Sequence, residues 1–407
     1  MFKTKNKFII KLAILCLALQ DVGAGAATPA LGAIQAAFPE VDPTLIQMIS
    51  TMPSLTVVIF GLLYAPMSKV MPKRAIMYIA AVTFIIGGVA PAFLNDIYPI
   101  LFFRALVGVG VGLLYPMAND LAVDFFEGGE RAKTIGQAFG IGMIGGAFFQ
   151  LIGGTLSDID WHYTFFAYFV SVLFFAFPVF FLPEPKKKEE VVRGTAQEKA
   201  KMPVTQFVSC IINAVCCCLF ITLITNAAMV IAMEGFGSGA EIGLAFSIMT
   251  LAAFVAGFAY GPSQKILRKG SMLPAPILLA LGLFVMSTAH SMGIVFTAMI
   301  LFGLGMGYTG SKFFAKSTEI VPFAVSALAL SMMTAFNGFG QLVSAPVMNW
   351  LVTVTGIGMG RPALQFAAIA MIGLGVIMVV FDVMTPKIPE SEKPEGTEGA
   401  MDAVQNS

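Results

Sequence analysis

The stretch Ala65-Pro66-Met67-Ser68-Lys69-Val70-Met71-Pro72-Lys73 has a counterpart 196 residues further along the chain, Gly261-Pro262-Ser263-Gln264-Lys265-Ile266-Leu267-Arg268-Lys269. Proline and lysine recur at matching places, in the pairs Pro66/Pro262, Lys69/Lys265 and Lys73/Lys269. A glycine run, Gly108-Val109-Gly110-Val111-Gly112, recurs as Gly303-Leu304-Gly305-Met306-Gly307 at an offset of 195 residues. Two matches at nearly one offset predict that the chain is an internal duplication, with two similar halves in the same topology.

The composition indicates that these halves lie in a membrane. Of the 407 residues, 57% are hydrophobic and 12% are charged, whereas a soluble domain has about 25% charged residues. The charges sit in short clusters between apolar stretches of about twenty residues, the length of helix that crosses a ~30 Å hydrocarbon core. Because the backbone in lipid must satisfy its own hydrogen bonds, we expect an all-α protein whose outer surface contacts the lipid bilayer. The net charge of +1 gives no sign of a nucleic-acid partner.

Twelve transmembrane helices are predicted, arranged as two pseudo-symmetric six-helix bundles. The expected spans are 8–37, 45–68, 75–94, 98–122, 134–156, 163–182, 205–232, 240–262, 272–290, 292–314, 323–352 and 363–384. This divides the chain into an N-terminal bundle (1–182), a polar linker (183–204), a C-terminal bundle (205–384) and a disordered tail (385–407).

The distribution of lysine and arginine predicts the orientation. Of the 24 basic residues, Arg104 falls inside a span and Arg361 on one side, and all the others gather on the opposite side. Basic residues are retained in the cytoplasm, so we expect both termini and the linker to be cytoplasmic, in a multi-pass protein of the plasma membrane. Ala24-Gly25-Ala26 resembles a signal-peptidase site. Apolar character resumes past Asp21 to about Phe38, so we expect the first span to be retained.

Several motifs resemble those of the major facilitator superfamily of transporters. Leu101-Phe102-Phe103-Arg104-Ala105-Leu106-Val107-Gly108-Val109-Gly110 is similar to its Arg-x-x-x-Gly-x-Gly signature. Further similarities are Glu130-Arg131 before the fifth span, Trp161-His162-Tyr163-Thr164-Phe165 before the sixth and Leu182-Pro183-Glu184 after it. The resemblance implies a monomer without cofactor or metal, in which two halves rock about a site for a small-molecule substrate.

The loop after the second span departs from the family pattern Gly-x-Leu-x-Asp-Arg-x-Gly-Arg-Arg. Ala65 stands at the first glycine, Lys69 at the aspartate, Pro72 at the second glycine and Lys73-Arg74 at the basic pair. In the family this aspartate helps to latch the cytoplasmic side, and a lysine cannot do so. The residues of the motif and its repeat are Lys69, Lys73, Arg74, Lys265 and Lys269.

Asp21 and Arg104 are the candidates for coupling and substrate binding. Asp21 is an acid near the middle of a span, where an ionised carboxylate costs ~2.5–3.5 kcal/mol unless it has a partner, a cavity or a proton. Arg104 shares one helix face with Gly108 and Gly112, and its alternative role is a structural pair with a backbone carbonyl or Asp120. An acid on the first span and an arginine on the fourth resemble the pattern of the proton-coupled drug antiporters of the superfamily, in which the acid exchanges protons. The antiporter motif of the fifth span is incomplete, because Gly153 and Gly154 are present without the family proline.

The six glycines of the repeated run are expected to let helices pack closely. Eight further polar or aromatic residues are predicted to line the central cavity: Gln20, Tyr115, Asn119, Thr222, Thr225, Asn226, Tyr308 and Thr309. Gln150, Asn337 and Gln341 are weaker candidates for the same cavity. The five cysteines are expected to pack rather than to bind a metal, and both histidines, His162 and His290, are expected near the outer surface.

These observations favour a secondary transporter that exports a small organic solute or drug in exchange for protons. The main alternative is uptake of an organic anion or metabolite bound by Arg104, by proton coupling or exchange. A non-transporting membrane sensor or scaffold is a further alternative. An enzyme is not expected, because the sequence shows no pair of catalytic groups or metal cluster at one depth.

Overall fold

The computed structural model of the protein describes residues 6–20, 22–185, 202–267, 271–322, 325–358 and 360–385. All regular elements in these ranges are helices. In chain order they are α1 (Lys7–Ala18), η1 (Gly23–Ala30), α2 (Leu31–Ala37), α3 (Pro43–Val70), α4 (Lys73–Val89), η2 (Ala90–Phe93), α5 (Ile97–Phe125), α6 (Gly128–Ser157), η3 (Trp161–Phe169), α7 (Val170–Phe181), α8 (Val204–Glu234), α9 (Gly239–Leu267), α10 (Pro274–Ser287), α11 (Met292–Glu319), α12 (Ser326–Thr355) and α13 (Arg361–Met384).

Each of the twelve expected spans corresponds to helical structure, which confirms the fold class. Ten segments are long and apolar enough to cross a membrane, α10 is a shorter apolar helix, and α12 completes the set. The first span, expected over 8–37, corresponds to the apolar segment Lys7–Ala37, which consists of α1, η1 and α2 rather than of one regular α-helix. Residues 186–201 of the expected linker and 386–407 of the expected tail lie outside the described residues, so the division of the chain stays a prediction.

The duplication is visible in matching helix contacts. A Cβ atom added at Gly108 of α5 would collide with the carbonyl oxygen of Pro53 in α3. In the second half, a Cβ at Gly303 of α11 would collide with the carbonyl oxygen of Met249 in α9. Gly112 and Gly307 repeat the relation against Val57 and Ala253. The contacted residues are 196 positions apart, like the loop repeat. The glycines therefore stand where two helix backbones approach too closely for a side chain.

The middle glycine of each run makes a second helix contact. A Cβ at Gly110 would lie 2.8 Å from the carbonyl oxygen of Ala80 in α4, and one at Gly305 would lie 2.8 Å from the amide nitrogen of Leu279 in α10. Each run thus packs α5 or α11 against two neighbours.

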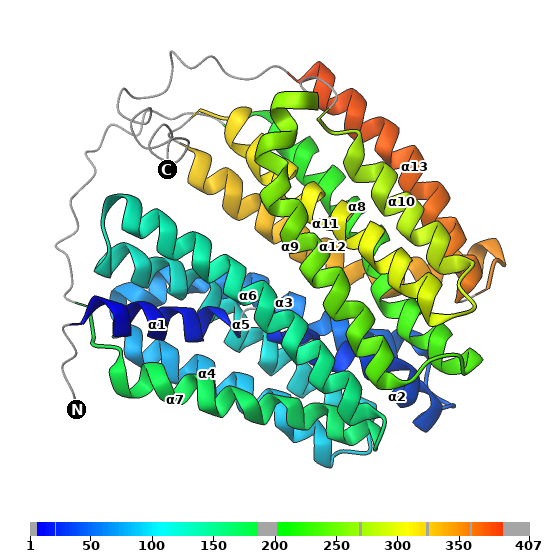
Figure 1. Ribbon diagram of the computed structural model, residues 1–407, viewed down its shortest axis with the longest axis horizontal. Helices are drawn as coiled ribbons and strands as arrows, with labels where there is room; N and C mark the ends of the chain where they lie inside the picture. Colours follow the sequence, from blue (N-terminus) through cyan, green and yellow to red (C-terminus); the bar gives the residue numbers. More distant parts are fainter. Residues whose placement is uncertain are drawn as a thin grey trace.

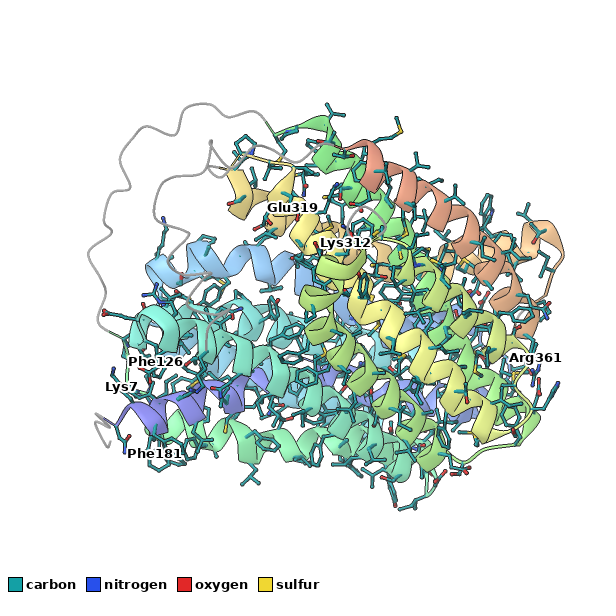
Figure 2. All side chains as sticks on the ribbon, turned by 45° about the horizontal axis from the view of Figure 1, so that its top comes forward. Lys7, Phe126, Phe181, Lys312, Glu319 and Arg361 are labelled. Carbon is teal, nitrogen blue, oxygen red and sulfur yellow. The ribbon has the colours of Figure 1, made fainter. Side chains whose placement is uncertain are left out.

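Figure 1 shows the two halves as two groups of helices, α1 to α7 and α8 to α13. Figure 2 shows that Lys7, Phe126 and Phe181 lie at one end of the first half and that Arg361 lies at the opposite end of the molecule. We call the end at which α1 begins and α7 ends the linker end, and the other the opposite end. The two halves meet mainly through the helix pairs α6 with α9, α3 with α12, and α2 with α8.

Candidate functional site

The first span is interrupted near the middle of its length. Between α1 and α2 the backbone forms the 3₁₀ helix η1, and the turn before it is also tightened, with Gly23 N–H bonded to the carbonyl of Gln20. Pro29 lies inside η1 and has no N–H to donate to the residue four positions earlier. Irregular backbone at membrane depth is tolerated where protein covers it or where it lines a cavity. The interruption is therefore a candidate region for the functional site.

Glycines of α6 cover this interruption. A Cβ atom at Gly145 would collide with the carbonyl oxygen of Leu19, and one at Gly153 would collide with that of Ala26. At Gly146 it would lie 2.5 Å from the side chain of Val22. Small residues allow this close approach, so the glycine-rich sequence of α6 holds the interrupted span in place.

Arg104 lies fully buried in the first half and donates to three oxygens. Its Nε bonds the carbonyl oxygen of Ile49 at 2.8 Å, Nη1 bonds the hydroxyl of Tyr168 at 2.6 Å, and Nη2 bonds the carbonyl oxygen of Ala24 at 2.5 Å. The Tyr168 hydroxyl in turn donates to Ala24 at 3.0 Å. Ile49 precedes Pro53 by four residues in α3, so its carbonyl has no helical N–H partner. Arg104 thus supplies a donor to the Ile49 carbonyl that Pro53 leaves free, and it adds one to the Ala24 carbonyl of η1.

Asp120, the other partner considered for Arg104, lies in a cluster at the linker end. Lys73 Nζ is 2.5 Å from Asp120 and 2.6 Å from Asp124, and the Tyr64 hydroxyl donates to Asp120 at 2.7 Å. The arginine and this acid are therefore not brought together.

Asp21 lies outside the described residues, so its place in the molecule stays a prediction. Its neighbour Gln20 is fully buried, and neither polar atom of its side-chain amide has a hydrogen-bond partner among the described residues. A buried amide without a partner costs about 1–3 kcal/mol. Gln20 therefore keeps unused hydrogen-bonding capacity beside the interruption.

The other predicted cavity residues make most of their hydrogen bonds within their own helices. Thr222, Thr225 and Asn226 of α8 are buried and donate to carbonyls four residues earlier. Thr309 of α11 does the same, and Tyr308 accepts a hydrogen bond from Ser263 at 3.0 Å. Tyr115 and Asn119 lie on α5, where the Asn119 amide donates to the Tyr115 carbonyl.

A cavity of about 620 Å³ lies between the halves in their linker-end part. It is lined mainly by α6 and α9, with one residue each from α1 and α11, and the eight predicted residues are not among its lining. Phe139, Phe254 and Phe258 give it an aromatic wall, and Lys133 and Gln137 are its polar groups on α6. Sequence reasoning missed these residues. The one signal was the glycine spacing of α6, where Gly136 and Gly140 leave room beside α9.

Polar contacts close the interface between the halves in the opposite-end part. Gln150 of α6 accepts from Thr250 of α9 at 2.9 Å, and Ser54 of α3 donates to Gln341 of α12 at 3.2 Å. Gln341 in turn donates to Asn337 at 2.6 Å. The three weaker candidates therefore lie at or beside the contact between the halves, away from the cavity.

The Asp158 carboxylate makes a further bridge at the opposite end. It follows α6 and accepts from the backbone N–H groups of Gly239 at 2.5 Å and Ala240 at 3.0 Å, where α9 begins. A carboxylate at a helix N-terminus is favoured by the free N–H groups and the helix dipole. Asp158 therefore caps a helix of the other half.

Replacing Asp158 with alanine is expected to loosen this closed end. Loss of a cap costs about 1 kcal/mol, which would shift the balance between closed and open forms by about fivefold. Spin labels on the exposed residues Ile159 and Met233, one in each half, would show a larger population at long distance. Asp160→Ala is the control, because that carboxylate bonds His162 within its own half. An unchanged distance distribution would contradict the role of Asp158.

Both histidines lie at the opposite end and are engaged locally. The ring of His162 contacts Asp160 at 2.6 Å and Asn95 at 3.0 Å, and the His162 backbone N–H lowers the pKa of the Asp160 carboxyl. His290 lies 3.1 Å from Arg361, which pairs with Glu234. Neither histidine is placed to act in the cavity.

At the linker end, each half holds a charged cluster, and the two clusters have opposite signs. In the first half Lys73 is shared by Asp120 and Asp124. In the second half Asp382 of α13 is shared by Lys312 and Lys316 of α11, at 3.0 Å from each. Each half therefore carries a charged cluster at this end, but the single shared residue comes from helices that the duplication does not equate, α4 in the first half and α13 in the second.

The remaining residues of the loop motif are only partly described. Arg74 donates to the carbonyl of Val179 at 2.8 Å, and the Glu184 carboxylate accepts from the backbone N–H groups of Lys73 and Arg74. Lys69 lies in the last turn of α3 and makes other contacts. Lys269 and the side chain of Lys265 lie outside the described part.

The fold and the cavity define a membrane transporter built from two six-helix halves. The chain belongs to the Major Facilitator Superfamily, whose sequence profile it matches over residues 13–213 and 210–404. Among the described residues, no group of three or more His, Cys, Asp or Glu side chains could hold a metal ion.

The individual proteins that the chain resembles share low sequence identity with it. Multidrug resistance protein 3 of Bacillus subtilis (strain 168) is 27% identical over 124 residues, 30% of this chain and 23% of that protein. The first curated relatives are matched over a quarter of their length or less. The putative metabolite transport protein YaaU of Escherichia coli is 22% identical over 356 residues, 78% of this chain and 79% of that protein. A crystal structure of a bacterial homologue of the human lysosomal transporter Spinster, inward-facing and unoccupied, has a TM-score of 0.74 and 16% identity, covering 94% of this chain and 97% of that one. These likenesses show the family and the fold, and leave the substrate open.

Proposed function

We propose that the protein is a secondary active transporter that works by alternating access and that its structure is the state open towards the linker end. The observation that carries this proposal is the asymmetry of the interface between the halves. Polar bridges such as Gln150–Thr250 and Asp158–Gly239 join α6 to α9 in the opposite-end part, whereas the same two helices line the cavity in the linker-end part. Rocking of the halves about this contact would move the opening from one end to the other.

The direction and coupling that we propose are export of a small organic solute in exchange for protons. The distribution of basic residues makes the linker end cytoplasmic in this proposal, and the open cavity would load substrate from the cytoplasm. Asp21, near the middle of the first span, is the proposed proton carrier. The name of the Bacillus subtilis relative, a multidrug resistance protein, is consistent with export.

The main alternative, uptake of an organic anion held by Arg104, receives less support from the geometry. All three nitrogens of the guanidinium donate to protein oxygens, and the side chain is fully buried. An anion would have to displace these contacts. The alternative of a non-transporting sensor or scaffold gives no reason for a cavity of about 620 Å³ between the halves.

Reconstitution into liposomes with an imposed pH gradient tests the proposed function. Wild-type protein should move protons across the membrane only when a transported solute is present, with solute accumulating against the proton flow. Asp21→Asn should lose gradient-driven accumulation, because a neutral amide cannot carry a proton. Glu127→Gln, which changes an exposed acid at the linker end, is the matched control and should behave as wild type. Solute transport without proton movement would overturn the coupling.

A further inference from the structure

The cavity between the halves is apolar over most of its surface and carries a single charged group. Twelve residues line it, and among them Lys133 is the one ionisable side chain. Among the described residues that line the cavity there is no carboxylate that could compensate a cationic substrate. In such a low-dielectric cavity the sign of one charge has a large effect on what binds.

Lys133 has no hydrogen bond or ion pair with any described residue, whereas its charged neighbours are engaged. Glu130 pairs with Lys7 at 3.6 Å, and Arg131 donates to the carbonyl of Phe126 at 3.0 Å. The ammonium group of Lys133 is therefore available to a ligand, and Gln137, one turn further along α6, is the nearest polar lining residue on the same face.

The rest of the lining suits an apolar body. Phe254 and Phe258 of α9 pack edge to face with their ring centroids 4.8 Å apart. Phe139 and Ile144 line the cavity from α6, and Phe258 is 67% exposed despite its place between the halves. Aromatic surface left uncovered in a cavity marks a binding region for an apolar group.

The polar and apolar parts are separated along the axis of α6. Lys133 stands in the second turn of the helix, near the linker end, and Ile144 lies eleven residues further towards the opposite end. At 1.5 Å per residue the two positions are roughly 16 Å apart. A ligand with its charge at one end and an alkyl chain or fused rings at the other would match both parts at once.

We propose that this cavity binds an amphipathic organic anion, with the anionic head at Lys133 and the apolar body against Phe139, Phe254 and Phe258. The proposal rests on the proposed function in that the bound anion is the transported substrate. It narrows the substrate from small organic solutes in general to those with one anionic head and an apolar body, and it places the head away from Arg104.

Binding of 1-anilinonaphthalene-8-sulfonate, a fluorescent amphipathic anion, tests the proposal in nanodiscs of zwitterionic lipid, with empty nanodiscs as the blank. Wild-type protein should bind the probe saturably. Dodecanesulfonate should displace it at much lower concentration than dodecyltrimethylammonium, which has the same chain and the opposite charge. Equal displacement by the two would overturn the proposed anion selectivity.

Two substitutions in the lining test separately whether binding needs the charge of Lys133 and whether it needs the open volume of the cavity. Lys133→Gln should raise the Kd of the probe by roughly tenfold, because it removes one charge-assisted hydrogen bond. Lys7→Gln, a change of a basic residue at the same end but outside the lining, should leave the Kd within about twofold. Gly136→Phe should abolish binding by filling the cavity, and it should fold, because no atom lies within 4 Å of a Cβ added there.

The outcomes distinguish this inference from the proposed function. If Lys133→Gln binds the probe as wild type does, the head-group site is refuted even when liposomes show proton-coupled transport. If the probe binds through Lys133 but no solute moves in liposomes, transport is refuted and the anion site stands.

Discussion

Replacing Arg104 with methionine is expected to lower the free energy of unfolding by roughly 3–5 kcal/mol, because it removes three hydrogen bonds made by a buried charged donor. The Ile49 carbonyl then has no donor in its place, and the Ala24 carbonyl keeps the Tyr168 hydroxyl. The guanidinium is fully buried and joins η1, α3 and η3 to α5 through Ala24, Ile49 and Tyr168. Each unsatisfied buried group costs about 1–3 kcal/mol. Methionine keeps the length and apolar character of the side chain, so the loss reports the hydrogen bonds rather than a cavity.

Thermal unfolding in detergent, without added solute, measures this effect. Arg104→Lys should recover part of the loss, since an ammonium group can reach one oxygen but not three at once. Tyr168→Phe should cost less than Arg104→Met, because it removes one hydroxyl and leaves the two carbonyl contacts. An Arg104→Met protein that unfolds like wild type but no longer binds an organic anion would instead support the uptake alternative.

The sequence predicted the parts of the fold that depend on local pattern. Apolar length, basic clusters and the glycine runs 108–112 and 303–307 each act through nearby residues, and their consequences were foreseeable. The interruption of the first span was not. Pro29 is visible in the sequence, but neighbouring helices can absorb a proline in a membrane. Whether the helix breaks depends on how closely Gly145 and Gly153 of α6 approach it.

The cavity was harder to predict because residue polarity does not report which way a side chain faces. Thr222 and Thr225 are polar, yet each satisfies its hydroxyl on the carbonyl four residues earlier in α8, as threonine in a helix can do without any cavity. The cavity lining on α6 is mostly glycine, phenylalanine and isoleucine, which are also typical of lipid-facing and packed positions. The position of the cavity depends on how α6 packs against α9, which the local sequence does not specify.

Asp382→Asn is expected to lower the free energy of unfolding by a similar amount, roughly 3–5 kcal/mol, because it leaves two buried ammonium groups without their shared counter-charge. The side chains of Lys312 and Lys316 are each 5% exposed and lie 3.0 Å from the two oxygens of one carboxylate, itself 9% exposed. Lys312 keeps a hydrogen bond to Ser271, and Lys316 keeps the carbonyls of Asp382 and Thr385. Those contacts solvate the cations but do not neutralise them.

A double substitution separates charge repulsion from loss of packing. If the two ammonium groups repel once the carboxylate is gone, Asp382→Asn combined with Lys312→Met should be more stable than Asp382→Asn alone, a positive coupling that thermal unfolding of the four proteins in a cycle would reveal. Glu130→Gln, which breaks the exposed pair with Lys7, should change stability by no more than about 0.5 kcal/mol. Strictly additive losses in the cycle would show that Asp382 acts through packing. The cluster of Asp382, Lys312 and Lys316 would then not be held together by its charges.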